Sequence, residues 1–186
     1  MVEKEGIESR LIFVLVLIMV VSGVSLAGLY QWTIPHIEAH EALARERAIF
    51  SVLPLAAAYE VIETDELLVY RGLDEAQNQV GYAMETRGGG FQGMITLMVG
   101  LDPEAEKLTG IEVLTMFETP GLGARIDEDN FKEQFTDKQF GDPFKAGKDI
   151  DTISGATLSV QAVGTIVSAA ITQFEALKLD SPGGEE

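Results

Sequence analysis

The sequence predicts an α+β protein, in which an antiparallel-rich sheet packs with helices in one domain that follows a single N-terminal transmembrane helix. Three observations predict this fold. An uncharged apolar segment lies near the N-terminus, β-branched runs separated by turn residues fill the middle, and apolar residues at spacings of three and four end the chain. The chain has 186 residues, which suits one modest domain and an extra segment.

The charge and the cysteine content exclude several classes of function. Lysine and arginine number 13 against 30 aspartates and glutamates, which gives a formal net charge of −17. Because nucleic acids and the cytoplasmic leaflet are both negative, we expect no nucleic-acid partner and no charge-driven membrane attachment. The chain has no cysteine, which excludes disulfides, cysteine-ligated iron–sulfur clusters and thiol catalysis.

The N-terminal apolar segment predicts a membrane anchor over residues 11–32. Residues 11–29 carry no charge, and at about 1.5 Å rise per residue they span roughly 28 Å, close to the hydrocarbon thickness of a bilayer. Tyr30 and Trp32 follow, as expected for an aromatic anchor at the interface. The alternative is a cleaved signal peptide ending at Ser25-Leu26-Ala27, but the apolar run is longer than a usual signal core.

The basic residues on either side of this segment predict its orientation only weakly. Lys4 and Arg10 precede it, while Arg45 and Arg47 follow at a short distance. The positive-inside rule then favours a cytoplasmic segment at residues 1–10.

Residues 33–60 predict a helical stalk that leads to the domain at residues 61–180. Thr33 is a suitable N-cap and Pro35 suits a first helical turn. His36 and His40 stand four apart and could share a helix face, but no third metal ligand is evident. We therefore interpret both histidines as surface residues and expect no metal site.

Alternating and β-branched runs predict the strands of the domain. Residues 67–70 and 80–84 are short strand-like stretches, and residues 94–101 and 108–117 flank a polar connector as a hairpin does. Glycines 88–90, just before the hairpin, favour either a plain loop or a close approach of the backbone to another group. On local grounds the loop is the preferred interpretation.

The C-terminal third predicts a short helix, a loop and a long helix. Residues 130–135 suit the short helix, and the spaced phenylalanines of residues 127–147 are more typical of core packing than of a ligand site. An apolar stripe then runs from Val160 to Leu177 over about five turns. A flexible tail is expected at residues 181–186.

A turn rich in hydroxyl groups precedes the long helix. It contains Ser154-Gly155-Ala156-Thr157 behind Asp151. One interpretation is that Ser154 or Thr157 only caps the helix. The other is that free amides and the positive end of the helix dipole receive a phosphate, with the small residues Gly155 and Ala156 leaving room for it.

Two motifs carry a resemblance to a known family. Residues 151–157, DTISGAT, resemble the D-x-x-(S/T)-G-A-T signature of the FMN-binding domain family, in which the last threonine is the flavin attachment site. Residues 118–123, ETPGLG, are similar to a second hallmark about 30 residues upstream. With the anchor, the chain resembles the G subunits of the Rnf complex, the ion-translocating ferredoxin:NAD oxidoreductase. Ser159 departs from relatives that often carry threonine there.

The resemblance implies FMN joined through its phosphate to Thr157, with Ser154, Gly155 and Ala156 around it. It further implies a flavin wall that includes Glu118, Thr119, Leu122 and Gly123. Other membrane subunits and a flavin transferase would be partners, and the domain would face the periplasmic side of the inner membrane. The protein would transfer electrons without catalytic residues of its own, and the chain has no Ser–His–Asp or Cys–His constellation.

Two alternatives to this function stay open. The C subunit of the sodium-translocating NADH:quinone reductase shares the flavin chemistry but is usually longer. A flavin-free structural or assembly subunit would keep the fold without the cofactor.

Overall fold

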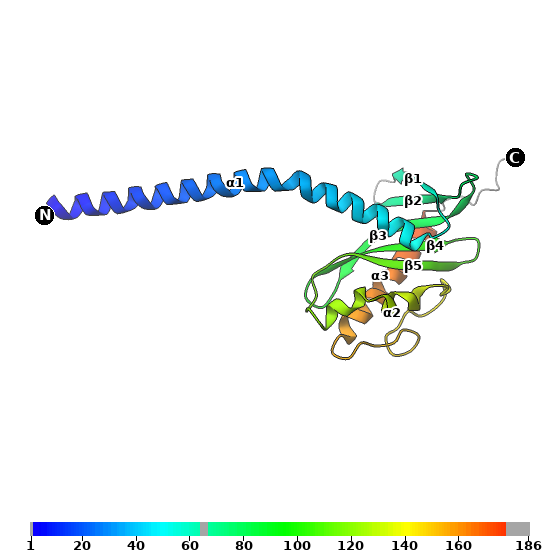
Figure 1. Ribbon diagram of the computed structural model, residues 1–186. Helices are drawn as coiled ribbons and strands as arrows, with labels where there is room; N and C mark the ends of the chain where they lie inside the picture. Colours follow the sequence, from blue (N-terminus) through cyan, green and yellow to red (C-terminus); the bar gives the residue numbers. More distant parts are fainter. Residues whose placement is uncertain (1, 64–66, 178–186) are drawn as a thin grey trace. The chain divides into compact units, whose positions relative to one another are not determined.

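The computed structural model describes residues 2–63 and 67–177 (Figure 1). Its elements are α1 (Val2–Val52), β1 (Ala58–Glu63), β2 (Leu68–Leu73), β3 (Gln79–Gly89), β4 (Met94–Asp102), β5 (Lys107–Met116), α2 (Asp129–Lys132) and α3 (Thr157–Ala176), with 3-10 turns at Gly123–Asp127 and Glu133–Phe135. The predicted α+β class is confirmed. The predicted tail at residues 181–186 lies outside the described residues.

The five strands form one antiparallel sheet in the order in which they follow each other in the chain. The predicted hairpin is confirmed as β4 and β5, whose register runs from Asp102 opposite Lys107 to Ile95 opposite Met116. Strand β1 was not predicted, because its alternating sequence AYEVIE carries two glutamates and it lies at the edge of the sheet.

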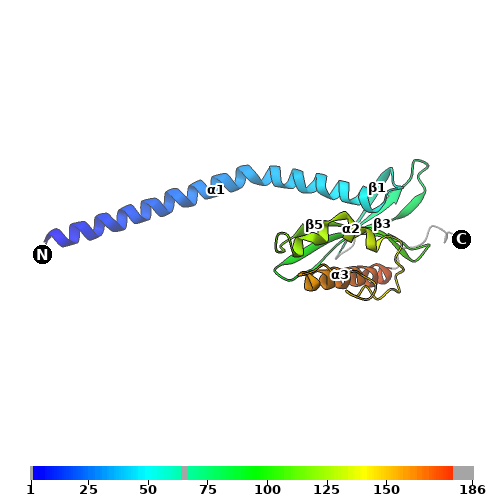
Figure 2. The same ribbon diagram turned by 60° about the horizontal axis from the view of Figure 1, so that its bottom comes forward.

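Helix α3 covers one face of the sheet, where Figure 2 shows it running beneath the strands. The core on this face consists of apolar side chains from β3, β4, β5 and α3, together with buried phenylalanines at 131, 135 and 144 from the connecting segment. The packing role predicted for these aromatics is confirmed. The predicted short helix is present as α2 and the 3-10 turn that follows it.

Two glycines allow α3 to lie close to its neighbours. A Cβ atom at Gly88 would lie 2.5 Å from Ile166 Cγ1, and one at Gly164 would lie 2.1 Å from the carbonyl oxygen of Phe144. Gly88 and Gly89 belong to β3, so the preferred interpretation of this glycine run as a plain loop is wrong. At Gly88 the alternative, a close approach of the backbone to another group, is the correct one.

The other face of the sheet is covered by the end of α1. Ala48, Ile49, Val52 and Leu53 are buried there against apolar side chains of β2, β3 and β4. The Thr109 hydroxyl donates to the Val52 carbonyl oxygen, and Arg45 forms an ion pair with Glu85 at 3.0 Å. The last two turns of α1 are therefore part of the domain, whose compact unit begins at Ala44.

Helix α1 is continuous through the predicted anchor and through Thr33 and Pro35, so the predicted helix start at Thr33 is wrong. Its side chains from Arg10 to Trp32 are exposed, and this part is long and apolar enough to cross a membrane. Helix α3 passes the same test of length and composition, but half of it is buried in the domain. The helix ends at Val52, two residues before Pro54, and β1 begins at Ala58, so the last residues of the predicted stalk are strand.

Candidate functional site

The start of α3 and the segment that follows β5 line one cavity of about 350 Å³. This volume is within the range of small-molecule sites, about 300–1,000 Å³. The lining residues are Phe91, Glu118, Thr119, Leu122, Gly123, Gly155, Ala156, Thr157, Leu158 and Ser159. They include seven of the eight residues predicted from the sequence, and the eighth, Ser154, is not among them.

Two other cavities are slightly larger than this one. A cavity of about 370 Å³ lies by Glu85, Arg87 and Gln173, and one of about 430 Å³ lies by Arg47 and Lys132. Neither contains the first turn of a long helix, nor any residue of the two motifs. We therefore assign the candidate site to the cavity at the start of α3.

The first turn of α3 is open toward this cavity. Thr157 is the first helical residue and Ala156 is the N-cap, and no side chain caps the helix. The prediction that Ser154 or Thr157 caps it is therefore wrong, because an alanine occupies the cap position between them. The first hydrogen bond of the helix runs from Val160 N to Ala156 O at 3.0 Å. The amides of residues 157–159 precede it, at the positive end of a 20-residue helix.

The turn before the helix depends on Gly155. Its φ is +79°, a left-handed conformation that glycine adopts without steric cost. A Cβ atom at this position would also lie 3.0 Å from Leu122 Cδ2. Leu122 therefore lies over the turn, and the two sequence motifs are in contact even though more than 30 residues separate them.

Glu118 connects three segments around the cavity. Its side chain is buried, with 8% of the residue exposed. Oε1 accepts hydrogen bonds from Phe91 N at 2.7 Å and Gln92 N at 3.3 Å, and Oε2 accepts one from Ser159 Oγ at 2.8 Å. The carboxylate thus joins the β3–β4 turn to the first turn of α3.

Two glycines leave the space that this carboxylate occupies. A Cβ atom at Gly90 would lie 2.2 Å from Glu118 Oε1, and one at Gly123 would lie 2.7 Å from Oε2 and 2.8 Å from Ser159 Oγ. Gly123 was predicted as a wall of the site, and in the structure it also leaves room for the hydrogen bond between Glu118 and Ser159. Gly90 was not predicted.

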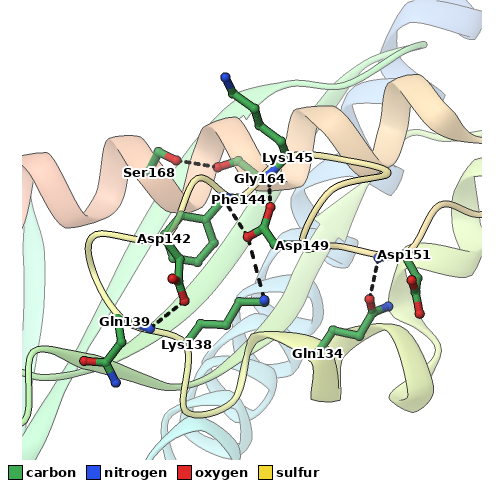
Figure 3. A network of polar contacts seen from close by, with 10 residues as sticks. All are labelled: Gln134, Lys138, Gln139, Asp142, Phe144, Lys145, Asp149, Asp151, Gly164 and Ser168. Carbon is green, nitrogen blue, oxygen red and sulfur yellow. Dashed lines mark hydrogen bonds and ion pairs between the residues drawn. The ribbon is translucent and has the colours of Figure 1, made fainter.

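The polar loop before the signature is fixed by side chains that accept hydrogen bonds from backbone N–H groups (Figure 3). The Asp149 carboxylate accepts bonds from Phe144 N at 3.0 Å and Lys145 N at 2.7 Å, and it lies 3.7 Å from Lys138 Nζ. Asp151 N donates to Gln134 Oε1 at 2.7 Å. These bonds hold the backbone in place up to Asp151, three residues before the turn at Ser154.

The electrostatics of the cavity suit an anion held by the backbone. Among the described residues that line it there is no lysine or arginine, and the carboxylate among them, Glu118, already accepts hydrogen bonds from three donors. Thr157 is exposed and is the first residue of α3, where the first-turn amides favour a phosphate group. The residues present therefore fit a phosphorylated ligand. Among the described residues, no three metal-ligating side chains converge.

Sequence reasoning missed Phe91, Leu158 and Ser159 as lining residues. Phe91 is 62% exposed and lies in the turn between β3 and β4, where Gly90 N donates to Gly93 O at 2.7 Å. A phenylalanine in a short turn flanked by glycines was a usable signal. Its position beside α3, however, depends on the three-dimensional pairing of distant segments.

Comparison with known proteins identifies similar chains. A family model described as an FMN-binding domain matches residues 90–172, a range that contains every residue lining the cavity. The G subunit of the ion-translocating oxidoreductase complex of Methanosarcina acetivorans is 35% identical over 178 residues, which cover 90% of this chain and 95% of the relative. The G subunit of the proton-translocating ferredoxin:NAD(+) oxidoreductase complex of Clostridium ljungdahlii is 33% identical over 100 residues, and the chain spans about half of its length, 53%.

A solved structure of a known protein shares the fold. NqrC of Shewanella oneidensis superimposes with a TM-score of 0.50 at 19% identity, covering 68% of this chain and 75% of that one. At this identity the likeness shows the fold alone.

Proposed function

The chain belongs to the family of G subunits of ion-translocating oxidoreductase complexes, and on that premise we propose that it carries FMN through a phosphoester on the Thr157 oxygen. As a redox subunit of such a complex, it would pass electrons between membrane partners and would not itself bind ferredoxin or NAD. The family membership and the FMN-binding domain support a membrane-bound flavoprotein for electron transfer. The covalent bond to Thr157 is the finer part of the proposal.

One observation carries the assignment to Thr157. This residue is exposed, is the first residue of an uncapped 20-residue helix, and lines a cavity with the second motif. A phosphate attached there would receive hydrogen bonds from the first-turn amides and would lie at the positive end of the helix dipole. A chain of net charge −17 would then hold this phosphate without a basic pocket.

The other residues of the site would bind and orient the cofactor. Gly155 and Ala156 leave the backbone accessible, Leu122 and Gly123 form one wall, and Thr119 could hydrogen-bond the cofactor. Bound FMN would supply electron transfer. Because the covalent bond would lie at the far end of the ribityl chain from the ring, it would act as a tether, and non-covalent contacts would set the flavin potential.

A tether suits the location that we propose. Residues 11–32 would cross the membrane once, with residues 1–10 in the cytoplasm and the domain on the extracytoplasmic side. Free FMN is expected to be scarce there, and reversible occupancy falls with ligand concentration. A separate flavin transferase with FAD as donor would form the bond, and Asp151 and Ser154 would belong to the segment that it recognises.

The two alternative functions are less well supported. A C subunit of the sodium-translocating quinone reductase would have a similar fold, but a relative that matches nearly the whole chain, that of Methanosarcina acetivorans, is a G subunit. The proteins that co-purify with this chain would distinguish the two complexes. A flavin-free assembly subunit would not require an uncapped start of α3 beside an exposed Thr157.

A denaturing gel tests the proposal. The full chain is produced together with a flavin transferase, denatured, separated and illuminated with ultraviolet light. We expect a fluorescent band for the wild type and a dark band for Thr157→Ala. The control is Thr165→Ala, which removes an exposed hydroxyl about two turns further along α3, outside the cavity, and should keep its fluorescence. A dark wild-type band would contradict covalent attachment, and a fluorescent Thr157→Ala band would move the attachment to another residue.

A further inference from the structure

Resting on the proposed FMN at Thr157, we propose that Phe91 is a ring-contacting residue for the flavin and that Glu118 is the positioning residue that holds it. The Phe91 side chain is 62% exposed although it lines the cavity together with Thr157. An exposed aromatic side chain in a ligand cavity commonly supplies a large apolar contact.

The position of Phe91 is defined by its backbone. The turn of residues 90–93 is closed by the bond from Gly90 N to Gly93 O, and the two central amides, those of Phe91 and Gln92, both donate to Glu118 Oε1. Hydrogen bonds to a charged acceptor are stronger than those between neutral groups. The turn is therefore held against the cavity even though the Phe91 side chain is largely exposed.

The same carboxylate fixes the distance from this turn to Thr157. Glu118 Oε2 accepts from Ser159 Oγ, two residues after Thr157 on α3. The aromatic side chain and the attachment point are thus connected through one buried group, which leaves little freedom in their separation. A carboxylate would ordinarily repel a phosphate in the same cavity. Here both oxygens of Glu118 already accept hydrogen bonds from the protein, so the carboxylate is compatible with the proposed phosphate.

A flavin bound through its phosphate would project its ring away from the first turn of α3, over the side chains that line the cavity. Phe91, Leu122 and Leu158 are the large apolar side chains among them, and Phe91 is the aromatic one. Aromatic rings prefer offset-stacked or edge-to-face contacts with other π systems. Contact with Phe91 therefore stabilises the docked position of the isoalloxazine ring, and the docked position in turn affects the flavin potential.

Phe117 offers a matched control. It is 72% exposed and lies next to Glu118, but it does not line the cavity. Its side chain packs beside Gly93, where an added Cβ atom would lie 2.6 Å from Phe117 Cβ. Substitutions at 91 and 117 thus change the same residue type at a similar exposure, and they differ in whether the side chain reaches the cavity.

The first test uses tryptophan as a contact probe, since an indole ring in contact with a flavin quenches flavin fluorescence by electron transfer. The full chain is loaded with FMN in detergent micelles, and its fluorescence is compared before and after denaturation. We expect Phe91→Trp to quench the native signal and Phe117→Trp to leave it at the wild-type level, with equal signals after denaturation. Equal native signals for the two variants would overturn the contact.

The second test removes the contact and then the residue that positions it. Phe91→Ala should shift the equilibrium between docked and undocked ring by about 2- to 10-fold, the factor expected for one lost aromatic pair. Visible circular dichroism of the flavin and quenching by iodide report this shift, and Phe117→Ala should leave both unchanged. Glu118→Gln, nearly isosteric, should change both readouts in the direction of Phe91→Ala.

The double variant separates positioning from a direct contact of Glu118 with the cofactor. If Glu118 acts through Phe91, Glu118→Gln should add nothing to either readout in the Phe91→Ala background. A full-sized effect there would overturn the positioning role. A dark wild-type band on the denaturing gel would contradict the covalent proposal itself, whereas a fluorescent band with no effect of Phe91 substitutions would overturn only this inference.

Discussion

An alanine at position 90 would place its Cβ atom 2.2 Å from Glu118 Oε1 and 2.7 Å from Ile95 Cδ1. Both distances are far inside van der Waals contact, so the carboxylate or the β3–β4 turn would have to move. Gly90 is not among the residues with positive φ, and alanine can adopt its backbone conformation without strain. The main cost of Gly90→Ala is therefore the displacement of the Glu118 carboxylate, which is the closer of the two contacts.

The hydrogen bonds of Glu118 give the magnitude of that cost. Withdrawal of Oε1 would break its bonds to Phe91 N at 2.7 Å and to Gln92 N at 3.3 Å. A hydrogen bond to a charged group contributes about 1.5–3 kcal/mol, and the longer bond contributes less, so the free energy of unfolding should fall by about 2–4 kcal/mol. For a domain of this size the midpoint of thermal unfolding should fall by roughly 5–15 °C.

Gly89→Ala is the matched control, because Gly89 directly precedes Gly90 as the last residue of β3 and nothing lies within 4 Å of a Cβ atom there. Thermal unfolding of both variants, followed by circular dichroism, should show a loss at 90 and a change within about 0.5 kcal/mol at 89. In a Glu118→Ala background the clash with the carboxylate is absent and only the close contact with Ile95 remains, so Gly90→Ala should cost clearly less than it does in the wild type. Equal losses at 89 and 90, or an undiminished loss at 90 without Glu118, would refute the reasoning.

Three further predictions concern the rest of the domain. A chain that begins at Ala44 should fold, whereas one that begins at Pro54 should not. It lacks the large buried side chains of Ile49 and Val52 in α1 and of Leu53 just after it, which stabilise by about 5–9 kcal/mol together. Lys132→Met should destabilise by about 1–3 kcal/mol, because it leaves the half-buried Glu112 carboxylate without its partner at 2.8 Å. Burial alone would lower the pKa of Lys132, but its hydrogen bonds to Glu112 and a second carboxylate raise that pKa above the ordinary value. The stabilisation by Lys132 should therefore be complete below about pH 10.4, the ordinary lysine pKa, and lost as the pH rises through the raised value. Gly164→Ala should lower the free energy of unfolding by about 1–3 kcal/mol, because its Cβ atom would meet a backbone carbonyl oxygen at 2.1 Å.

Each of these has a measurement that can contradict it. Size-exclusion chromatography and circular dichroism test the truncations, and a folded monomer that begins at Pro54 would contradict the role of α1. Urea unfolding between pH 7 and 11 tests Lys132, and a difference from the wild type that grows above pH 10.4 would contradict the sign. Gly141→Ala, where nothing lies within 4 Å of a Cβ atom, is the control for position 164, and equal effects would refute the steric argument.

The features that the sequence predicted well depend on local patterns. The β4–β5 hairpin and α3 have clear periodicity, and the two motifs contain seven residues that line the cavity. Strand β1 escaped prediction because an edge strand with two glutamates lacks a strong apolar pattern. The interpretation that Ser154 or Thr157 caps α3 failed because these hydroxyl residues stand on both sides of Ala156. The local sequence does not determine which of these three residues occupies the cap position.

The parts that the sequence could not predict depend on contacts between distant residues. Ser159 bonds to Glu118 across 41 residues, and Phe91 reaches the cavity because β3 continues through Gly88 and Gly89 to a turn beside α3. The need for glycine at position 90 likewise depends on the position of the Glu118 carboxylate, which a Cβ atom there would meet. Local composition does not specify these distances, which are set by the packing of α3 on the sheet.

Peptide mass spectrometry of the mature protein tests the central claim most directly. The full chain is produced with a flavin transferase and digested, and the peptide that contains Thr157 is fragmented. We expect this peptide to be heavier by the mass of FMN less one water, with the added mass on Thr157. An unmodified Thr157 peptide in flavin-containing protein, or the added mass on Ser154 or Ser159, would contradict the claim.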